Sequence, residues 1–283
     1  MLVPIDETNM ERAHALLARG FPSRQPAFWV EGLKRQAEHH ARRDGGAIGQ
    51  LLRVGGDDVG VILTMRSWRA DAAGGRRKIV NLSSWYVEEA HRWLAPRMLK
   101  SVLSEPDAIH TDLTPSENVE QLNGRLGLMP WNDGVLLVVL PAVAWRRDER
   151  PAEVVGLDAV PRGQLPATTW TMLEDHQALG CICIALRRGE AYRPLIFTRT
   201  RRKGLPTARL IYADSKGELA GAIAAVSRFL LAHAILMLEV PARRDERLPA
   251  AWFSEGMRPT FARGAIDPDS VDHAYSELVL LQY

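Results

Sequence analysis

Side chains that can take up or donate protons follow two apolar stretches in the segment 80–131. Glu88 and Glu89 come directly after the first stretch, and Asp112 ends the second. A carboxylate held beside a reacting group can act as its general base. His91 is a further base, or a hydrogen-bond donor to a phosphate. A solvated turn explains the two glutamates and the histidine without any chemistry, so both interpretations stay open at this point.

A turn that carries two arginines follows, and it leads into a helix-like apolar stretch. Arg92 and Arg97 flank the small residue Ala95, and Pro96 directly precedes Arg97. The first turn of a helix has unpaired backbone N–H groups and the positive end of the helix dipole, so it binds phosphate groups. Proline removes one such donor, which a guanidinium can replace through a charge-assisted hydrogen bond. The pattern predicts a phosphate-binding turn, unless Arg97 projects into solvent and the helix begins later.

A sheet with helices beside it has to hold these residues in place. The first half predicts a strand, two helices, three strands and then alternating helices and strands, at residues 3–5, 8–19, 26–40, 47–54, 59–66, 78–87, 95–104, 108–113, 117–126 and 134–140. Gly55-Gly56-Asp57-Asp58 is a hairpin turn between the first two of the three consecutive strands. This order indicates an α/β fold whose mixed sheet, largely antiparallel, carries helices on both faces.

The order of elements and the arginine turn resemble the GNAT superfamily of acyl-CoA N-acyltransferases. In that family a strand leads into an Arg/Gln-x-x-Gly-x-Gly/Ala turn and a helix, and a later helix closes on Gly-Phe. Here Arg92 matches the leading residue, Ala95 the first glycine, Arg97 the last small residue and Gly127-Leu128 the closing pair. The resemblance spans most of residues 1–143 as an order of elements and the segment 80–131 as a motif.

The resemblance implies that this half binds acetyl-CoA or another acyl-CoA. The strand before the turn would pair its backbone at Tyr86 and Val87 with the pantetheine arm, as an added strand does. The family's helix-start asparagine falls on Ser116 or Asn118, for which a helix cap is the other explanation. Asn123 stands where many GNAT enzymes have a tyrosine that protonates the departing thiolate, and an amide cannot act as that acid. The expected cofactor-binding residues are Tyr86, Val87, His91, Arg92, Trp93, Leu94, Ala95, Arg97, Asn118 and Asn123. The expected catalytic residues are Glu88, Glu89 and Asp112.

The second half repeats the order of elements with weaker signals. It predicts strands at 181–186, 195–200, 209–213, 235–240 and 277–281 and helices at 218–233 and 250–256. The charged segment 144–152 is expected to link a first domain, 1–143, to a second, degenerate GNAT-like domain, 153–283. Asp214 and Glu218 flank the turn that would receive a phosphate in the second domain, where negative charge is unfavourable. We therefore expect no cofactor site in that domain.

Composition narrows the classes of partner. The 36 basic and 34 acidic residues nearly balance, which is not the charge of a dedicated nucleic-acid binder. The basic hairpin 187–203 is either a solvated sheet edge or a phosphate-binding one. Cys181 and Cys183 are too few for a four-ligand metal site or a disulfide framework. With no apolar run of about 18 residues, we expect a cytoplasmic protein that uses no metal and has no membrane partner.

The sequence is best interpreted as a tandem acyltransferase that moves an acyl group from an acyl-CoA to a small-molecule or peptide amine. A second hypothesis is a non-catalytic binding or scaffolding protein built from decayed domains, which Ala95 and Asn123 favour. A third is a transferase that takes an aminoacyl group from a tRNA, for which the basic hairpin is the only support.

Overall fold

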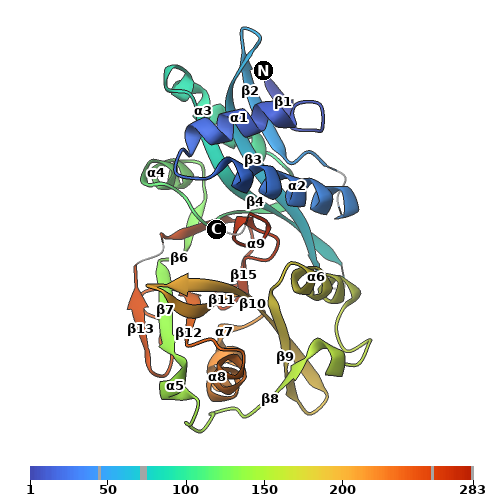
Figure 1. Cartoon of the computed structure of the whole chain (residues 1–283), viewed down its shortest axis with the longest axis vertical. Coiled ribbons are helices and arrows are strands. Elements are labelled where there is room, and N and C mark those ends of the chain that lie inside the picture. Colours follow the sequence, from blue (N-terminus) through green and yellow to red (C-terminus); the bar gives the residue numbers. More distant parts are fainter. Residues whose placement is uncertain (44–45, 71–74, 256–257, 282–283) are drawn as a thin grey trace. The chain divides into compact units, whose positions relative to one another are not determined.

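The computed structural model describes residues 1–43, 46–70, 75–255 and 258–281, which form two compact units (Figure 1). The first unit comprises Met1–Met129, Phe261–Ala265 and Tyr275–Tyr283. The second unit comprises Pro130–Thr260 and Ile266–Ala274. Each unit is discontinuous because the last part of the chain contributes to both. The division therefore differs from the expected one, in which residues 1–143 and 153–283 were separate domains.

The first unit is built on the strands β1-β2-β3-β4-β5-β14 of a mixed sheet, in that order. The strands are β1 (Leu2–Pro4), β2 (Gly49–Val54), β3 (Asp57–Ala70), β4 (Arg76–Val87), β5 (Ala108–Asp112) and β14 (Thr260–Arg263). The short strand β6 (Met129–Asn132) has all but its first residue in the second unit. The helices are α1 (Met10–Gly20), α2 (Pro26–Arg43), the short 3₁₀ helix η1 (Glu89–Leu94), α3 (Ala95–Leu103), α4 (Glu117–Arg125) and α9 (Glu277–Leu280). β4 and β5 are parallel, whereas β1 to β4 pair antiparallel in succession. The expected mixed sheet is confirmed.

Glycines shape two turns of the first unit. Gly55 and Gly56 have φ angles of 60° and 99° and connect β2 to β3. Positive φ at both central residues suits a two-residue hairpin turn, so the predicted hairpin is confirmed. At the end of α4, Gly127 has φ 85° and donates its N–H to Gly124, while Leu128 donates to Asn123. This pair of bonds is a Schellman cap, which fixes where α4 ends.

The core of the first unit explains why α3 forms on this segment. Met98, Leu99 and Val102 of α3 are buried and pack with Val80 and Leu82 of β4. Their spacing places them on one face of a helix. Burial of that face stabilises α3, which follows β4 and η1 directly in the chain.

The second unit has a sheet of the order β13-β7-β12-β11-β10-β9-β8, and β15 also pairs with β11. Its strands are β7 (Gly134–Val139), β8 (Glu153–Gly156), β9 (Ile182–Arg188), β10 (Ala191–Arg202), β11 (Leu205–Ala213), β12 (Met237–Ala242), β13 (Ala251–Ser254) and β15 (Val271–Asp272). Its helices are α5 (Leu140–Val143), the 3₁₀ helix η2 (Leu157–Ala159), α6 (Ala167–Ala178), α7 (Lys216–Gly221) and α8 (Ile223–Ala232). β11 and β12 are parallel, as β4 and β5 are in the first unit.

The expected linker 144–152 is part of the second unit. The carboxylate of Asp148 accepts hydrogen bonds from the N–H groups of Ala224 and Ala225 at 2.7 and 3.0 Å. It thereby caps α8 at its start, where a negative charge is favourable. In the same unit, β7 pairs with β12 and β13. β12 and β13 are far from β7 in the sequence. For this reason no local pattern near residue 143 showed that β7 belongs to the second unit.

Three expected elements of the second half are wrong. The expected helix 250–256 is the strand β13, which pairs with β7, and residue 256 lies outside the described residues. The expected strand 277–281 is the helix α9, which begins where the Ser276 side chain accepts a hydrogen bond from the N–H of Leu278. The expected helix 218–233 is divided into α7 and α8 at Ala222.

The sequence also gave no indication of β8 and α6. α6 buries Thr169 and His176 together with Trp170, Met172 and Leu173. Because polar residues interrupt its buried face, the apolar spacing that indicates an amphipathic helix is weak.

Candidate functional site

Strands β4 and β5 of the first unit pair and then separate. Their parallel pairing ends at Leu82 opposite Asp112. Directly afterwards β4 has a bulge in its pairing with β3, and Ser84 has a φ of 42°. A bulge bends a strand and changes the direction of its side chains. The backbone edge of residues 83–87 is therefore not paired with β5.

A pocket of about 300 Å³ lies where the two strands separate. Ser83, Ser84 and Trp85 of β4 line it together with Asp112 and Thr114 from the end of β5. Residues 21, 23 and 24, between α1 and α2, also line it. Ligand pockets begin at roughly this volume. The pocket can therefore hold a small group beside residues 83–85 of β4.

Asp112 is the acidic residue in the wall of this pocket. It is 7% exposed, and Asn123 Nδ2 donates a hydrogen bond to its Oδ2 at 2.9 Å. Burial raises the pKa of Asp112 to about 6, although the hydrogen bond from Asn123 acts in the opposite direction. A carboxyl group with a pKa near neutrality can both take up and release a proton during a reaction. The structure thus brings one of the three expected catalytic residues to the pocket.

Glu88 and Glu89 are not among the residues that line the pocket in the described part of the chain. Glu88 forms an ion pair with Arg19 of α1 at 2.6 Å. Glu89 is exposed in the first turn of η1. Both therefore have the surroundings of ordinary turn residues.

The expected phosphate-binding turn is the 3₁₀ helix η1, which continues directly into α3. The N–H of Ala95 donates to the carbonyl of Arg92 inside this helix and is not available to a phosphate. Arg92 and Arg97 are exposed, and neither guanidinium group forms a hydrogen bond or ion pair with another described residue. Trp93 is 75% exposed between them. Anion binding at this turn would therefore depend on the two guanidinium groups more than on the backbone.

The remaining expected cofactor residues lie around this turn and along β4. The ring of Tyr86 packs against Gly20, where no side chain would fit, and Val87 is buried in the core. Their backbone, and not their side chains, is therefore what they could offer to a ligand. His91 and Leu94 are half-buried in η1.

The two asparagines of α4 have different surroundings. Asn118 is exposed in the first turn of the helix. Asn123 is fully buried and holds Asp112. It therefore positions the acidic residue, although it cannot replace the tyrosine acid of the family.

Sequence reasoning missed Ser84, Thr114 and Glu277. Ser83-Ser84 is a polar pair inside an apolar strand, and this interruption could have indicated the bulge. The hydroxyl of Thr114 donates to Glu277 Oε1 at 2.9 Å across 163 residues of sequence. No local sequence pattern can indicate a contact between residues so far apart in the chain.

The second unit shows the same separation of strands with a different outcome. The parallel pairing of β11 with β12 ends at Arg209 opposite Glu239. β11 then has a bulge in its pairing with β10. Beyond the bulge, β15 pairs with β11, with Tyr212 opposite Asp272. Beyond its parallel partner, β11 therefore pairs with β15, whereas β4 has no further pairing with β5.

Glu239 holds the position in the second unit that Asp112 holds in the first. It is 2% exposed and forms ion pairs with Arg202 at 2.9 Å and with Arg209 at 2.8 Å. Two guanidinium groups neutralise this carboxylate, so it is held in a structural role.

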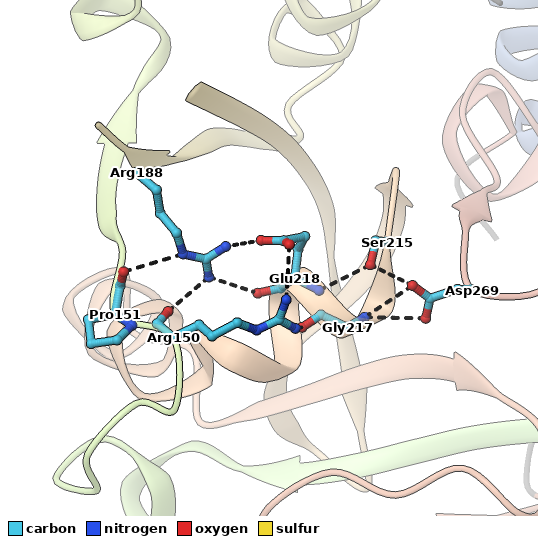
Figure 2. Close-up of polar contacts among 7 residues, drawn as sticks. All are labelled: Arg150, Pro151, Arg188, Ser215, Gly217, Glu218 and Asp269. Carbon is cyan, nitrogen blue, oxygen red and sulfur yellow. Dashed lines mark hydrogen bonds and ion pairs between the residues drawn. The ribbon is translucent and has the colours of Figure 1, made fainter. Parts of the chain in front are cut away.

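The start of α7 is likewise occupied by side chains of the second unit (Figure 2). The carboxylate of Asp269 accepts hydrogen bonds from the Ser215 hydroxyl and the Gly217 N–H. Glu218 lies between Arg150 and Arg188 and is bonded to both. Asp269 thus takes the backbone donor that a phosphate would use in a GNAT-like site.

The basic hairpin of the second unit is engaged in contacts within that unit. Arg187 pairs with Glu153, Arg199 donates to the carbonyl of His233, and Arg201 donates to that of Gly204. Among the hairpin cations, Arg187, Arg188 and Arg202 are paired with acidic residues, whereas Arg199 and Arg201 bond only to neutral carbonyls.

Both cysteines are buried and free, and the described residues show no metal cluster. Burial raises the pKa of Cys181 to about 11 and that of Cys183 to about 12, so both are neutral thiols. No group of three or more His, Cys, Asp or Glu residues within the described ranges could hold a metal ion. None of the helices described is long and apolar enough to cross a membrane.

Comparison with solved structures identifies the fold. A GCN5-related N-acetyltransferase from Anabaena variabilis superposes with a TM-score of 0.61 at 11% identity, covering 93% of this chain and 72% of that one. One from Kribbella flavida has a TM-score of 0.53 at 14% identity, with 93% and 70% covered. Eis1 from Mycobacterium abscessus has a TM-score of 0.50 at 17% identity, with 93% and 72% covered. This protein has the GNAT fold. The likeness extends over both units, which confirms the expected fold and its two-domain arrangement. No protein-family model matches the chain, and no curated protein matches it in sequence.

Proposed function

We propose that the protein transfers an acyl group from an acyl-CoA to a primary amine of a small molecule or peptide, at the pocket of the first unit. The observation that carries this proposal is the separation of β4 from β5 beside Asp112. The solved structures of this fold that are named N-acetyltransferases support the reaction class. Fold alone does not establish chemistry. The reaction is therefore inferred from the residues that line the pocket, Asp112 above all.

The part of β4 beyond its pairing with β5 could lie along the pantetheine arm of an acyl-CoA. Residues 83–87 offer backbone groups that β5 does not use, and an arm with amide groups can pair with such an edge as an added strand does. Arg92 and Arg97 then supply the positive charge for the phosphates. The engaged amide of Ala95 does not fit a backbone phosphate site, and Pro96 has no N–H to offer.

Asp112 is the proposed general base. The amine must lose a proton as its nitrogen attacks the thioester carbon, and Asp112 can accept that proton once its carboxyl is ionised. The C–N bond forms, the C–S bond breaks, and the departing thiolate takes up the proton that Asp112 accepted from the amine, which returns the carboxyl to its ionised form. Asn123 holds the carboxylate in a fixed orientation during this exchange.

Release of free CoA thiol in the presence of acetyl-CoA and a panel of primary amines tests the proposal. We expect turnover with at least one amine and a rise of the thermal midpoint with CoA, because a ligand of the native state stabilises it by mass action. Binding without turnover would favour the non-catalytic hypothesis. Absence of any shift of the thermal midpoint at millimolar CoA would show that the protein does not bind this cofactor.

We expect the reaction to take place in the cytoplasm.

A further inference from the structure

Glu277 is a buried acidic residue that the proposed reaction leaves without a role. It begins α9, is 0% exposed and belongs to the first unit, as Asp112 does. The Thr114 hydroxyl donates to its Oε1 at 2.9 Å, and the side chain of Asn81 is a second neighbour of the carboxyl. α9 is itself fixed by Arg35 of α2, whose Nε donates to the carbonyl of Leu280 at 2.8 Å.

Packing alone does not explain an acidic residue at this position. A buried carboxyl group is costly to ionise unless positive charge compensates it, and no arginine or lysine among the described residues pairs with this one. Burial raises the pKa of Glu277 to about 8, with the charge of Asp112 as the second contribution. The group is therefore neutral at pH 7, where it accepts the bond from Thr114 without adding a second negative charge beside Asp112.

Thr114 connects Glu277 to the pocket. It follows Asp112 by two residues, at the point where the chain leaves β5 and turns towards α4, and it lines the pocket itself. A partner that holds Thr114 therefore fixes the direction of the chain that carries Asp112.

We infer that Glu277 is a positioning residue for acyl transfer: through Thr114 it holds Asp112 in its working orientation at the pocket. This inference rests on the proposed function. Asp112 itself accepts hydrogen bonds from the Asn123 side chain and from the Thr114 backbone, so the residue that Glu277 holds also contacts this carboxylate. Catalytic groups need such restraint because small displacements cost large factors in rate.

Activity of three variants separates positioning from proton transfer. Glu277→Ala removes the acceptor of the Thr114 bond, so we expect kcat to fall on the order of 10- to 100-fold with little change in KM. Glu277→Gln keeps a neutral acceptor and should restore most of the rate. Thr114→Val should lower kcat like Glu277→Ala, and the double variant should be no worse than either, since both remove the same bond. A Gln variant as slow as the Ala variant would overturn the inference, because an ionisable group would then be required.

The pH profile gives a readout that simple misfolding would not produce. The groups that face Glu277 are Asp112 of β5, Thr114 and Asn81 of β4. In the wild type we expect kcat to fall above the raised pKa of Glu277, where two adjacent anions form, and Glu277→Gln should remove this alkaline limb. An unchanged limb in the Gln variant would contradict the inference.

Titration of the carboxyl carbons by NMR keeps the inference testable without turnover. Asp112→Asn should lower the pKa of Glu277 because it removes a neighbouring charge. Glu277→Gln should leave the titration of Asp112 unchanged, and Glu277→Ala should shift it as the carboxylate loses its fixed surroundings. If the wild type transfers no acyl group but these titrations behave as stated, the proposed function fails and the positioning contact stands. If Asp112 titrates identically in all variants, the positioning inference fails whatever the activity.

Discussion

The two units of this protein contain the same separation of parallel strands, and they use it in opposite ways. In the first unit β4 leaves β5 at Asp112 and a pocket lies between them. In the second unit β11 leaves β12 at Glu239, and the strand β15 pairs with the edge that becomes free. The separation of the two parallel strands is common to both units. They differ in that β15 pairs with β11 beyond the separation, whereas a pocket lies at the corresponding part of β4.

The acidic residues at the two equivalent positions show the same contrast. Asp112 has no cationic partner in the described contacts, and burial raises its pKa towards neutrality. Glu239 is paired with two arginines. A buried acid without a counter-ion can exchange a proton, while a neutralised one stabilises the unit around it. The neighbouring side chains therefore decide the role of the acidic residue: an asparagine contacts Asp112, and two arginines contact Glu239.

The largest expected effect is the loss of activity in Asp112→Asn. The amide keeps the size of the side chain and removes the base, so kcat should fall by about 10²- to 10⁴-fold. The free energy of unfolding should not decrease, because the neutral amide is easier to bury than a carboxylate. Thiol release measures the rate, and Glu31→Gln, an exposed position on α2, is the control. A rate within a few-fold of the wild type would show that the base lies elsewhere.

The equivalent substitution in the second unit should affect stability instead. Glu239→Gln leaves Arg202 and Arg209 without their shared counter-charge, and we expect the free energy of unfolding to drop by about 2–3 kcal/mol. Urea denaturation measures this, with Glu174→Gln in the exposed pair with Arg162 as the control of small effect. Unchanged stability would mean that the second unit does not depend on this ion pair.

The two exposed arginines should affect affinity for CoA. If they contact the phosphates, Arg92→Ala or Arg97→Ala should weaken binding by about 1.5–3 kcal/mol each. Isothermal titration should give at most one site per chain, and the double variant should lose it. Lys100→Ala, an exposed position on the same helix as Arg97, should bind normally. A second saturable site that survives the double variant would assign binding to the other unit.

A smaller effect is expected on the pH dependence of stability. The folded-state pKa values of Asp112 and Glu277 lie above those of the unfolded chain, so the folded state holds more protons between about pH 4 and pH 8. The free energy of unfolding therefore falls as the pH rises through this window. Asp112→Asn/Glu277→Gln should flatten the fall, on the order of 1 kcal/mol per pH unit at its steepest. Denaturation at pH 5, 7 and 8.5 checks the slope, which should remain in Glu31→Gln.

The sequence predicted much of the first unit because its signals are local. The hairpin at Gly55-Gly56 and the helix end at Gly127 follow from turn chemistry that neighbouring residues specify. Asp112 could be selected because it ends an apolar strand.

The contacts that distinguish the two units could not be predicted in this way. The bond between Thr114 and Glu277, the pairing of β15 with β11 and the cap that Asp148 provides for α8 all join distant residues. They depend on how the chain returns to each unit, and no local pattern encodes that path. The turn at Arg92 also differs from the expectation. The resemblance implied backbone N–H groups available to a phosphate, whereas the turn is a 3₁₀ helix in which the N–H of Ala95 bonds to the carbonyl of Arg92.

Hydrogen–deuterium exchange with and without CoA tests the central claim most directly, because the two units serve as each other's control. We predict that CoA binds along residues 83–87 of β4, beyond the pairing with β5, and not along β11, whose residues Tyr212 and Ala213 already pair with β15. CoA should therefore slow exchange at the amides of residues 83–87 and leave those of Tyr212 and Ala213 unchanged. Added protection at Tyr212 and Ala213, or no change at 83–87 when the ligand is bound, would contradict this prediction.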